Sequence, residues 1–138
     1  MTPSRPLFAT FYRDSAHPVP DSAPEEEGKF VILAKGRGIH LIFSPVSLTP
    51  YHADIVYRYL QVEGRGEVEA VSSSGCRILS KGWAVHGGGY YTVQHWLRHL
   101  ILHGKSTAFG KYDPKLLGPV ADGIAEKLGL GAFTLEFK

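Results

Sequence analysis

Short apolar runs separated by glycine-containing turns dominate the chain. Residues 30–34 (FVILA) are apolar throughout, which is typical of an interior strand covered on both faces. The turn segment 35–38 (KGRG) leads into a second run over 39–44, so the two runs predict a β-hairpin. At the end of the chain, apolar and polar residues alternate over 133–138, which predicts a half-buried strand.

A helical pattern of apolar positions begins near Thr49 and Pro50. Threonine is a good N-cap, and proline suits the first helical position, where a backbone N–H has no partner within the helix. Gly64 and Gly66 then provide a stop signal. The pattern predicts a helix that starts at Pro50 and carries His52 in its first turn. The apolar stripe of this helix is Ala53, Val56, Tyr57 and Leu60.

The segments on either side of this helix have weaker patterns. Residues 1–27 contain one short apolar piece, several prolines and a run of glutamates at 25–27. This composition predicts an N-terminal arm followed by a solvated loop. Residues 67–79 predict one long strand that is interrupted near 72–75 by a bulge or a bend.

Two further segments have helical character. Residues 82–103 carry apolar residues at helical spacing that Gly104 would end, yet their last apolar residues fit a buried strand equally well. Asp113 and Pro114 have the properties of a cap and a first helical position. Gly118-Pro119 would bend or restart the helix that follows. The apolar stripe of that second helix is Leu117, Val120, Ala121, Ile124 and Leu128.

The composition narrows the class of protein. The 138 residues match one ordinary domain, and 16 glycines indicate many turns, as in sheet proteins. The formal net charge of +2 is too balanced to favour a nucleic acid or a membrane as partner. A single cysteine, Cys76, excludes an internal disulfide, and no initial apolar run resembles a signal peptide or a membrane span. We therefore expect one domain, residues 1–138, in the cytoplasm; the sequence leaves its oligomeric state open.

His52 is the first candidate for chemistry. The positive end of the helix dipole disfavours an imidazolium in the first turn by about 0.3–1 kcal/mol, which biases this histidine toward the neutral form that a general base needs. The unpaired amides of the same turn form an anion site. A neutral base beside an anion site suits attack on a phosphoryl group. On residues 49–55 alone, however, an ordinary surface histidine is the simpler interpretation.

Three other motifs are incomplete or ambiguous. Residues 104–107 have the tail of a phosphate-binding P-loop, but His99 stands where its first glycine is required. Residues 86–89 (HGGG) are similar to the oxyanion loop of esterases, but the chain has no Gly-X-Ser-X-Gly, so we interpret them as a turn. Residues 106–110 combine small residues near a predicted strand end, which leaves backbone N–H groups for an anion-binding nest.

Three histidines recur every four residues and would share one face of a helix or a strand. Such spacing can bind zinc. No carboxylate or cysteine stands in register to complete the site, so we expect a polar, partly exposed face and no metal. The three residues are His95, His99 and His103.

In three ordered motifs the chain resembles the protein histidine phosphatases, the Janus/ocnus-like family. Residues 51–55 (YHADI) match that family's hallmark. Lys29 stands where the family has a substrate-contacting lysine, and residues 106–110 match its Ser-X-Ala-aromatic-Gly phosphate loop. The spacing from the hallmark to Arg77-Ile78 is also similar to that of the family, and the resemblance covers residues 19–138.

The resemblance implies an α/β (α+β) fold with a single mixed β-sheet of about six strands and one helix on each face. It also implies a phosphatase that needs no metal or other cofactor and hydrolyses phosphohistidine, or another phosphoramidate, on a protein or a small molecule. His52 would be the general base that activates water, and Lys29 would hold the phosphate. The other implied phosphate contacts are the amide of Ala53 and the backbone of Ser106, Thr107 and Ala108, with Arg77 as an auxiliary residue.

Two segments depart from the family's pattern. Residues 43–48 replace a basic and aromatic stretch that the family has before its hallmark, which leaves the choice of substrate open. The segment between Ile78 and Ser106 is longer than in the family, so we interpret residues 82–97 as an insertion that forms a substrate lid, a dimer contact or a longer hairpin. An alternative function is a non-catalytic module that binds phosphate or a phosphorylated peptide. The presence of His52 favours the enzyme, because a binding module needs no base.

Overall fold

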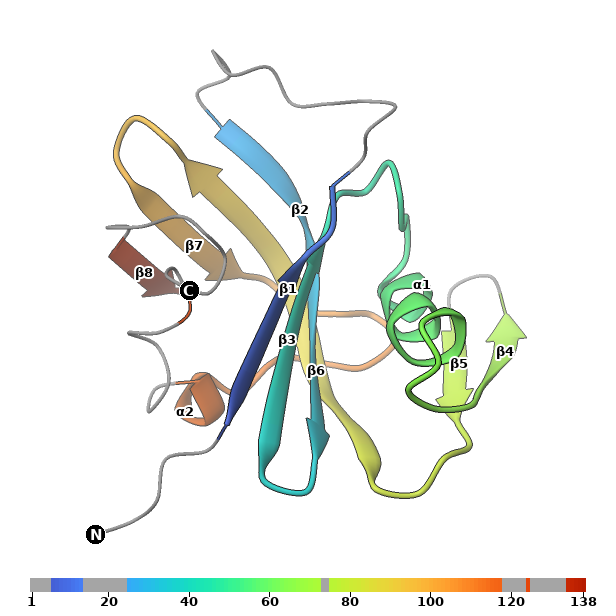
Figure 1. Cartoon of the computed structure of the whole chain (residues 1–138). Helices are drawn as coiled ribbons and strands as arrows, with labels where there is room; N and C mark the ends of the chain where they lie inside the picture. Colours follow the sequence, from blue (N-terminus) through green and yellow to red (C-terminus); the bar gives the residue numbers. More distant parts are fainter. Residues whose placement is uncertain (1–5, 14–24, 73–74, 118–123, 125–133) are drawn as a thin grey trace, which may run out of the picture.

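The computed structural model describes residues 6–13, 25–72, 75–117, 124 and 134–138. The strands of the main sheet are β1 (Leu7–Phe11), β2 (Glu25–Lys35), β3 (Gly38–Ser44), β6 (Trp83–Gln94), β7 (His99–His103) and β8 (Thr134–Phe137). They form a six-stranded mixed sheet in the order β1-β3-β2-β6-β7-β8 (Figure 1). β1 is parallel to β3 and β8 is parallel to β7, whereas the other neighbours are antiparallel.

The predicted hairpin and the predicted C-terminal strand are confirmed. β2 and β3 pair through a tight turn in which Gly36 has φ +58°, a backbone conformation that glycine adopts readily. The side chains of residues 30–33 are fully buried, because both faces of the sheet are covered at this point. In β8 the side chains of Leu135 and Phe137 pack against the core.

The acidic run at 25–27 lies in β2, so the prediction of a solvated loop there is wrong. Glu26 is only 6% exposed, and its carboxylate accepts a hydrogen bond from the Arg13 guanidinium at 2.8 Å. Alternation along the strand turns Glu26 inward, and the ion pair offsets the cost of burying its charge. The apolar piece of the predicted N-terminal arm is β1, at the edge of the sheet. Pro18, Pro20 and Pro24 of that arm lie outside the described residues.

The first helix lies where the apolar stripe predicts it. It comprises α1 (His52–Tyr57) and, continuing directly from it, η1 (Arg58–Val62). Gly64, with φ +75°, follows its end, in agreement with the predicted stop. His52 is the first helical residue, so its predicted place in the first turn is confirmed.

The cap of α1 is Tyr51, whereas the sequence predicts Thr49. The Thr49 hydroxyl is buried and hydrogen-bonds the Ser44 hydroxyl at 2.6 Å. The Tyr51 N–H donates to the Asp54 carboxylate at 3.0 Å, and the Asp54 N–H donates to the Tyr51 carbonyl oxygen at 3.0 Å. The helix therefore starts later than predicted, because tertiary contacts hold the threonine in the preceding loop.

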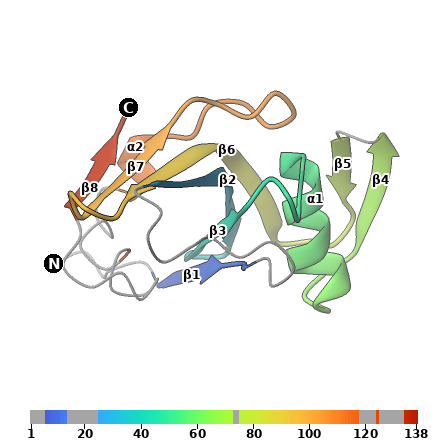
Figure 2. The same cartoon turned by 90° about the horizontal axis from the view of Figure 1, so that it is seen from above.

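Helical residues cover both faces of the sheet, as the predicted fold requires (Figure 2). On one face, Ile55 and Leu60 pack with Val31 and Leu33 of β2. On the opposite face, Leu117 at the end of α2 (Pro114–Leu117) packs in the core cluster that contains Phe30 and Ile124. No helix among the described residues is both long and apolar enough to cross a bilayer.

The predicted cap of α2 is confirmed. The Asp113 carboxylate accepts a hydrogen bond from the Lys115 N–H at 2.9 Å, and Pro114 is the first helical residue. Leu117 and Ile124 of the predicted apolar stripe are fully buried. The other stripe residues, Val120, Ala121 and Leu128, lie outside the described residues.

Residues 67–79 form a hairpin and not one long strand, so this prediction is wrong. β4 (Val68–Ser72) and β5 (Gly75–Ile78) pair antiparallel as a two-stranded ribbon, separate from the main sheet. Ser72 pairs with Gly75, and serine and glycine favour a turn as readily as a bulge. Val68 packs with the residues of α1, which holds the ribbon beside that helix (Figure 2).

Residues 82–103 form strands, which settles the ambiguity of that segment. β6 lies between β2 and β7, and its Tyr91 and Val93 are fully buried. Most of the segment interpreted as an insertion is therefore part of the sheet, and it forms a long hairpin with β7. The hairpin turn contains Arg98, which has φ +50°. Helical spacing failed as a signal here because Trp96 and Leu97, two of the spaced apolar residues, are exposed in the turn between β6 and β7.

Candidate functional site

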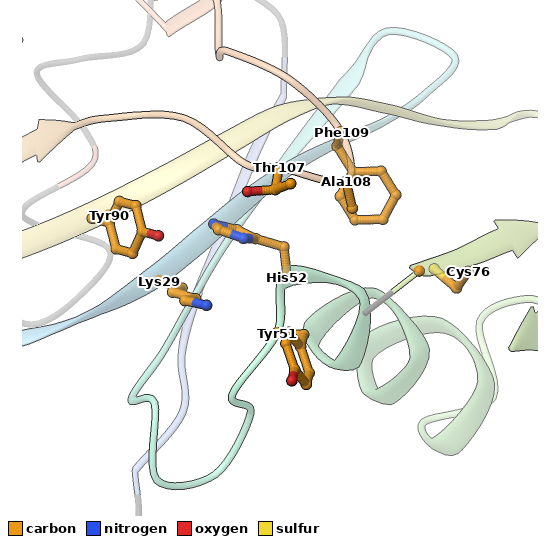
Figure 3. Close-up of a pocket in the computed structure, with 9 residues that line it drawn as sticks. Lys29, Tyr51, His52, Cys76, Tyr90, Thr107, Ala108 and Phe109 are labelled. Carbon is orange, nitrogen blue, oxygen red and sulfur yellow. The ribbon is translucent and has the colours of Figure 1, made fainter. Parts of the chain in front are cut away.

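A cleft of about 560 Å³ opens where the start of α1 meets β2, β6 and the loop after β7. Figure 3 shows the side chains that surround it. The β5 end of the ribbon closes one side of the cleft. The lining residues are Lys29, Tyr51, His52, Gly75, Cys76, Tyr90, Thr107, Ala108 and Phe109.

His52 is held in one orientation by the main chain of β6. Its side chain is 5% exposed, and Nε2 lies 2.8 Å from the carbonyl oxygen of Gly89. A carbonyl oxygen can only accept a hydrogen bond, so Nε2 carries a proton. In the neutral ring the lone pair is therefore on Nδ1, which is the atom available to accept a proton.

Burial keeps this imidazole neutral. Removal of the ring from water lowers the pKa of His52 below its usual value of 6.5. The hydrogen bond to Gly89 acts in the opposite direction, whereas the positive charge of Lys29 lowers the pKa further. The sequence predicts a neutral His52 because of the helix dipole, whereas in the folded protein burial is the largest cause of the lowered pKa.

The glycines of β6 make the close approach of His52 possible. A Cβ on Gly88 would lie 2.5 Å from the Phe30 carbonyl oxygen and 3.1 Å from the His52 ring. A Cβ on Gly89 would lie 2.4 Å from the His103 carbonyl oxygen. Residues 86–89 are thus a strand segment on which other backbone packs directly, and their interpretation as a turn is wrong.

Gly87 makes room for the loop that follows β7. It has φ +95°, and a Cβ there would lie 2.6 Å from the Lys111 carbonyl oxygen. A backbone bridge joins Gly88 to Lys111. The pairing of β2 with β6 shifts register between Val31 and Leu33, opposite these glycines. The irregularity in β6 therefore places the end of the loop against the strand that orients His52.

The loop at 106–110 is closed by its own hydrogen bonds. The Ser106 N–H donates to the Gly110 carbonyl oxygen at 3.1 Å, and the Gly110 N–H donates to the Ser106 carbonyl oxygen at 2.8 Å. The Ser106 hydroxyl, which is 1% exposed, accepts from the Phe109 N–H at 3.1 Å. Among the described residues the amides of Thr107 and Ala108 have no partner. Thr107 and Ala108 line the cleft, so their amides stay the predicted anion nest, whereas the buried Ser106 holds the loop closed.

Lys29 brings a positive charge to the same cleft. Its ammonium group donates a hydrogen bond to the Pro50 carbonyl oxygen just before α1. The Nζ atom lies 5.7 Å from the ring centres of both Tyr51 and Tyr90. Lys29 lies within β2, and its pairing with Tyr90 across β2 and β6 sets it beside a cleft residue of β6.

Three of the predicted site residues, Ala53, Ser106 and Arg77, do not line this cleft. Ala53 borders an adjoining hollow of about 270 Å³, which shares Gly75 and Cys76 with the cleft. Arg77 is on β5, and its guanidinium donates to the carboxylate of Glu69. These two residues are cross-strand partners in the ribbon.

The three spaced histidines have three different partners. His95 lies 3.4 Å from the Glu26 carboxylate and His99 lies 2.8 Å from the Glu136 carboxylate. His103 Nε2 is 3.0 Å from the Thr92 hydroxyl. Within the part of the chain that the structure describes, no group of three His, Cys, Asp or Glu side chains is placed to hold a metal ion.

Sequence reasoning missed three side chains that line the cleft, Tyr51, Cys76 and Tyr90, and also the Gly89 carbonyl. Tyr51 and Cys76 each lie beside a motif residue but carry no signal of their own. Burial, with a contribution from Asp54, raises the pKa of the Cys76 thiol to about 11, so it is not a thiolate nucleophile at neutral pH. Tyr90 could have been found from a correct assignment of β6 as a strand, because that strand pairs Tyr90 with Lys29.

Comparison with known proteins assigns no family. Neither a protein-family model nor a curated protein matches the chain. The chemistry of the cleft therefore has to follow from its own residues: one oriented neutral base, two unpartnered amides and one ammonium group.

Proposed function

We propose that the protein is a metal-independent phosphatase that hydrolyses phosphohistidine, or another phosphoramidate, on a protein or a small molecule. The observation that carries the proposal is that a buried, neutral His52 lines the same cleft as Thr107 and Ala108, whose amides have no partner among the described residues. Lys29 adds a positive charge that favours a phosphoryl group. The resemblance of residues 51–55 and 106–110 to the protein histidine phosphatases supports the same function.

The proposed reaction is attack of water on phosphorus. His52 Nδ1 takes a proton from the water as its oxygen bonds to phosphorus, and the P–N bond breaks. The leaving nitrogen keeps the bonding electron pair and receives a proton, so the products are inorganic phosphate and the free amine or imidazole. Lys29 and the loop amides offset the charge on the phosphoryl oxygens. A labile P–N bond suits a site whose proposed base is one weakly basic imidazole.

Release of inorganic phosphate from a histidine-phosphorylated protein and from free phosphoramidate tests this proposal. We expect release that exceeds the protein-free blank and that excess EDTA leaves unchanged. Binding of phosphate without release would instead identify a non-catalytic phosphate-binding module. Inhibition by EDTA, followed by recovery of activity when zinc is added, would contradict the metal-independent mechanism.

Replacing Lys29 with alanine should raise KM about 10-fold and change kcat much less. The ammonium group is expected to bind the phosphoryl group equally in the ground state and the transition state, and a hydrogen bond to a charged group contributes about 1.5–3 kcal/mol. Steady-state kinetics on phosphoramidate measures the two constants. Lys35→Ala is the matched control, because Lys35 is at the other end of β2 and lies over Trp83. A fall in kcat at constant KM would show that Lys29 acts on the transition state alone.

The pH profile should have an acid limb with its midpoint below 6.5. His52 accepts a proton only when neutral, and burial lowers its pKa, so kcat/KM is retained as the pH falls to 6.5 and is lost below it. The profile is measured as enzyme-dependent release after subtraction of the acid-catalysed blank. In Lys29→Ala the midpoint should move upward, because a nearby positive charge is removed. A midpoint above 6.5 would contradict the assignment of His52 as the base.

A further inference from the structure

Tyr90 lines one side of the cleft (Figure 3). On β6 it stands directly between Lys29 of β2 and His103 of β7. Cross-strand partners project from the same face of a sheet, so these three side chains form one row. The Tyr90 ring lies 5.7 Å from the His52 ring, with 79° between their planes, and 5.7 Å from Lys29 Nζ. Tyr90 therefore borders both the base and the ammonium group.

The ring of Tyr90 is held firmly in this place. His103 stacks against it with 6.1 Å between the ring centres and 25° between the planes. His103 itself contacts the Thr92 hydroxyl at 3.0 Å. Gly104, with φ +73°, brings the backbone so close that a Cβ there would lie 2.7 Å from the Tyr90 ring. These contacts fix the direction of the Tyr90 hydroxyl without using its hydrogen-bonding capacity.

The hydroxyl of Tyr90 is uncommitted and exposed enough to reach a ligand, whereas the unpartnered hydroxyl of Tyr91 is fully buried. The hydroxyls of Tyr12, Tyr59 and Tyr112 all make hydrogen bonds to protein groups. Within the described residues the Tyr90 hydroxyl has none. Figure 3 shows it directed into the space between Lys29 and His52, whereas the Tyr51 hydroxyl points away from that space.

We propose that Tyr90 is a phosphate-binding residue, whose hydroxyl donates a hydrogen bond to an oxygen of the bound phosphoryl group. A phosphoryl group presents three non-bridging oxygens, and the cleft offers three kinds of donor from three sides. These are the Lys29 ammonium, the amides of Thr107 and Ala108, and the Tyr90 hydroxyl. The inference rests on the phosphate-binding part of the proposed function and adds a contact that does not depend on the hydrolytic step.

Binding of inorganic phosphate to Tyr90→Phe tests the inference. The substitution removes only the hydroxyl and leaves the ring in contact with His52 and His103. By isothermal titration calorimetry we expect the variant to bind inorganic phosphate about 10-fold more weakly than the wild type, as for loss of one hydrogen bond to a charged group. Tyr57→Phe is the matched control and should bind as the wild type does. Tyr57 is 39% exposed, against 38% for Tyr90, and does not line the cleft.

The outcomes separate this inference from the proposed hydrolysis. Equal phosphate affinity of Tyr90→Phe and wild type would overturn the inference, even if both hydrolyse phosphoramidate. Weaker binding by Tyr90→Phe, in a protein that releases no phosphate from phosphoramidate, would support it while rejecting the hydrolytic function. Absence of phosphate binding to the wild type would overturn both. Thermal unfolding of both variants checks that a change in affinity is not a loss of folded protein.

Discussion

Replacing His52 with asparagine is expected to lower the rate of phosphoramidate hydrolysis about 100-fold or more, the usual contribution of a general base. Asparagine is polar and uncharged like the neutral imidazole but supplies no basic nitrogen in place of Nδ1. The variant should therefore fold and lose turnover rather than affinity. Initial rates of phosphate release measure the effect, and urea unfolding checks that the protein is intact.

His86→Asn provides the matched control for this experiment. His86 is an exposed histidine on β6, the same strand that orients His52, and it does not line the cleft. Its substitution should leave the rate within about 2-fold of wild type, because surface changes are usually within ±0.5 kcal/mol. Turnover by His52→Asn close to that of His86→Asn would show that another group is the base.

The second large effect is expected at Gly87. Gly87→Ala should destabilise the protein by about 2–5 kcal/mol, from about 1–2 kcal/mol of backbone strain and about 1–3 kcal/mol of overpacking. The new Cβ would meet the Lys111 carbonyl oxygen at 2.6 Å, so the loop at 106–110 must move away from β6. A displacement of about 1 Å in a substrate-positioning loop can cost about 100-fold in rate.

Gly82→Ala is the control that separates backbone strain from steric overlap. Gly82 has φ +90°, close to the +95° of Gly87, but a Cβ there has nothing within 4 Å. Gly82→Ala should be destabilised only by the backbone strain, about 1–2 kcal/mol, and should keep its hydrolytic rate. Urea denaturation of both variants measures the free energy of unfolding. Equal destabilisation and equal rates in the two would show that the Lys111 contact does not position the loop.

Part of the site could be predicted because its residues carry local signals. His52 has a helix start before it, and the loop at 106–110 has small residues whose amides cannot all find partners. Lys29 precedes an apolar strand. Each of these features is encoded within a few neighbouring residues, and the structure brings His52, Lys29, Thr107 and Ala108 into one cleft.

The remainder of the site depends on partners that are distant in the chain. The Gly89 carbonyl that orients His52 comes from β6, and Tyr90 faces Lys29 only because β6 pairs with β2. Arg77 matched by spacing, but its pairing with Glu69 takes it out of the cleft. Sequence spacing does not report which strands become neighbours.

By itself the sequence determined the elements whose cause is local. An unbroken apolar run followed by a glycine turn specifies the β2–β3 hairpin, alternation specifies β8, and Asp113-Pro114 specifies the start of α2. Tertiary structure decided the rest. It buried Thr49 so that α1 starts later, and it drew the acidic run into β2, where Arg13 pairs with Glu26. It also packed other backbone segments directly against the glycines of β6. Each of these outcomes depends on the free energy of packing between distant segments and not on local propensity.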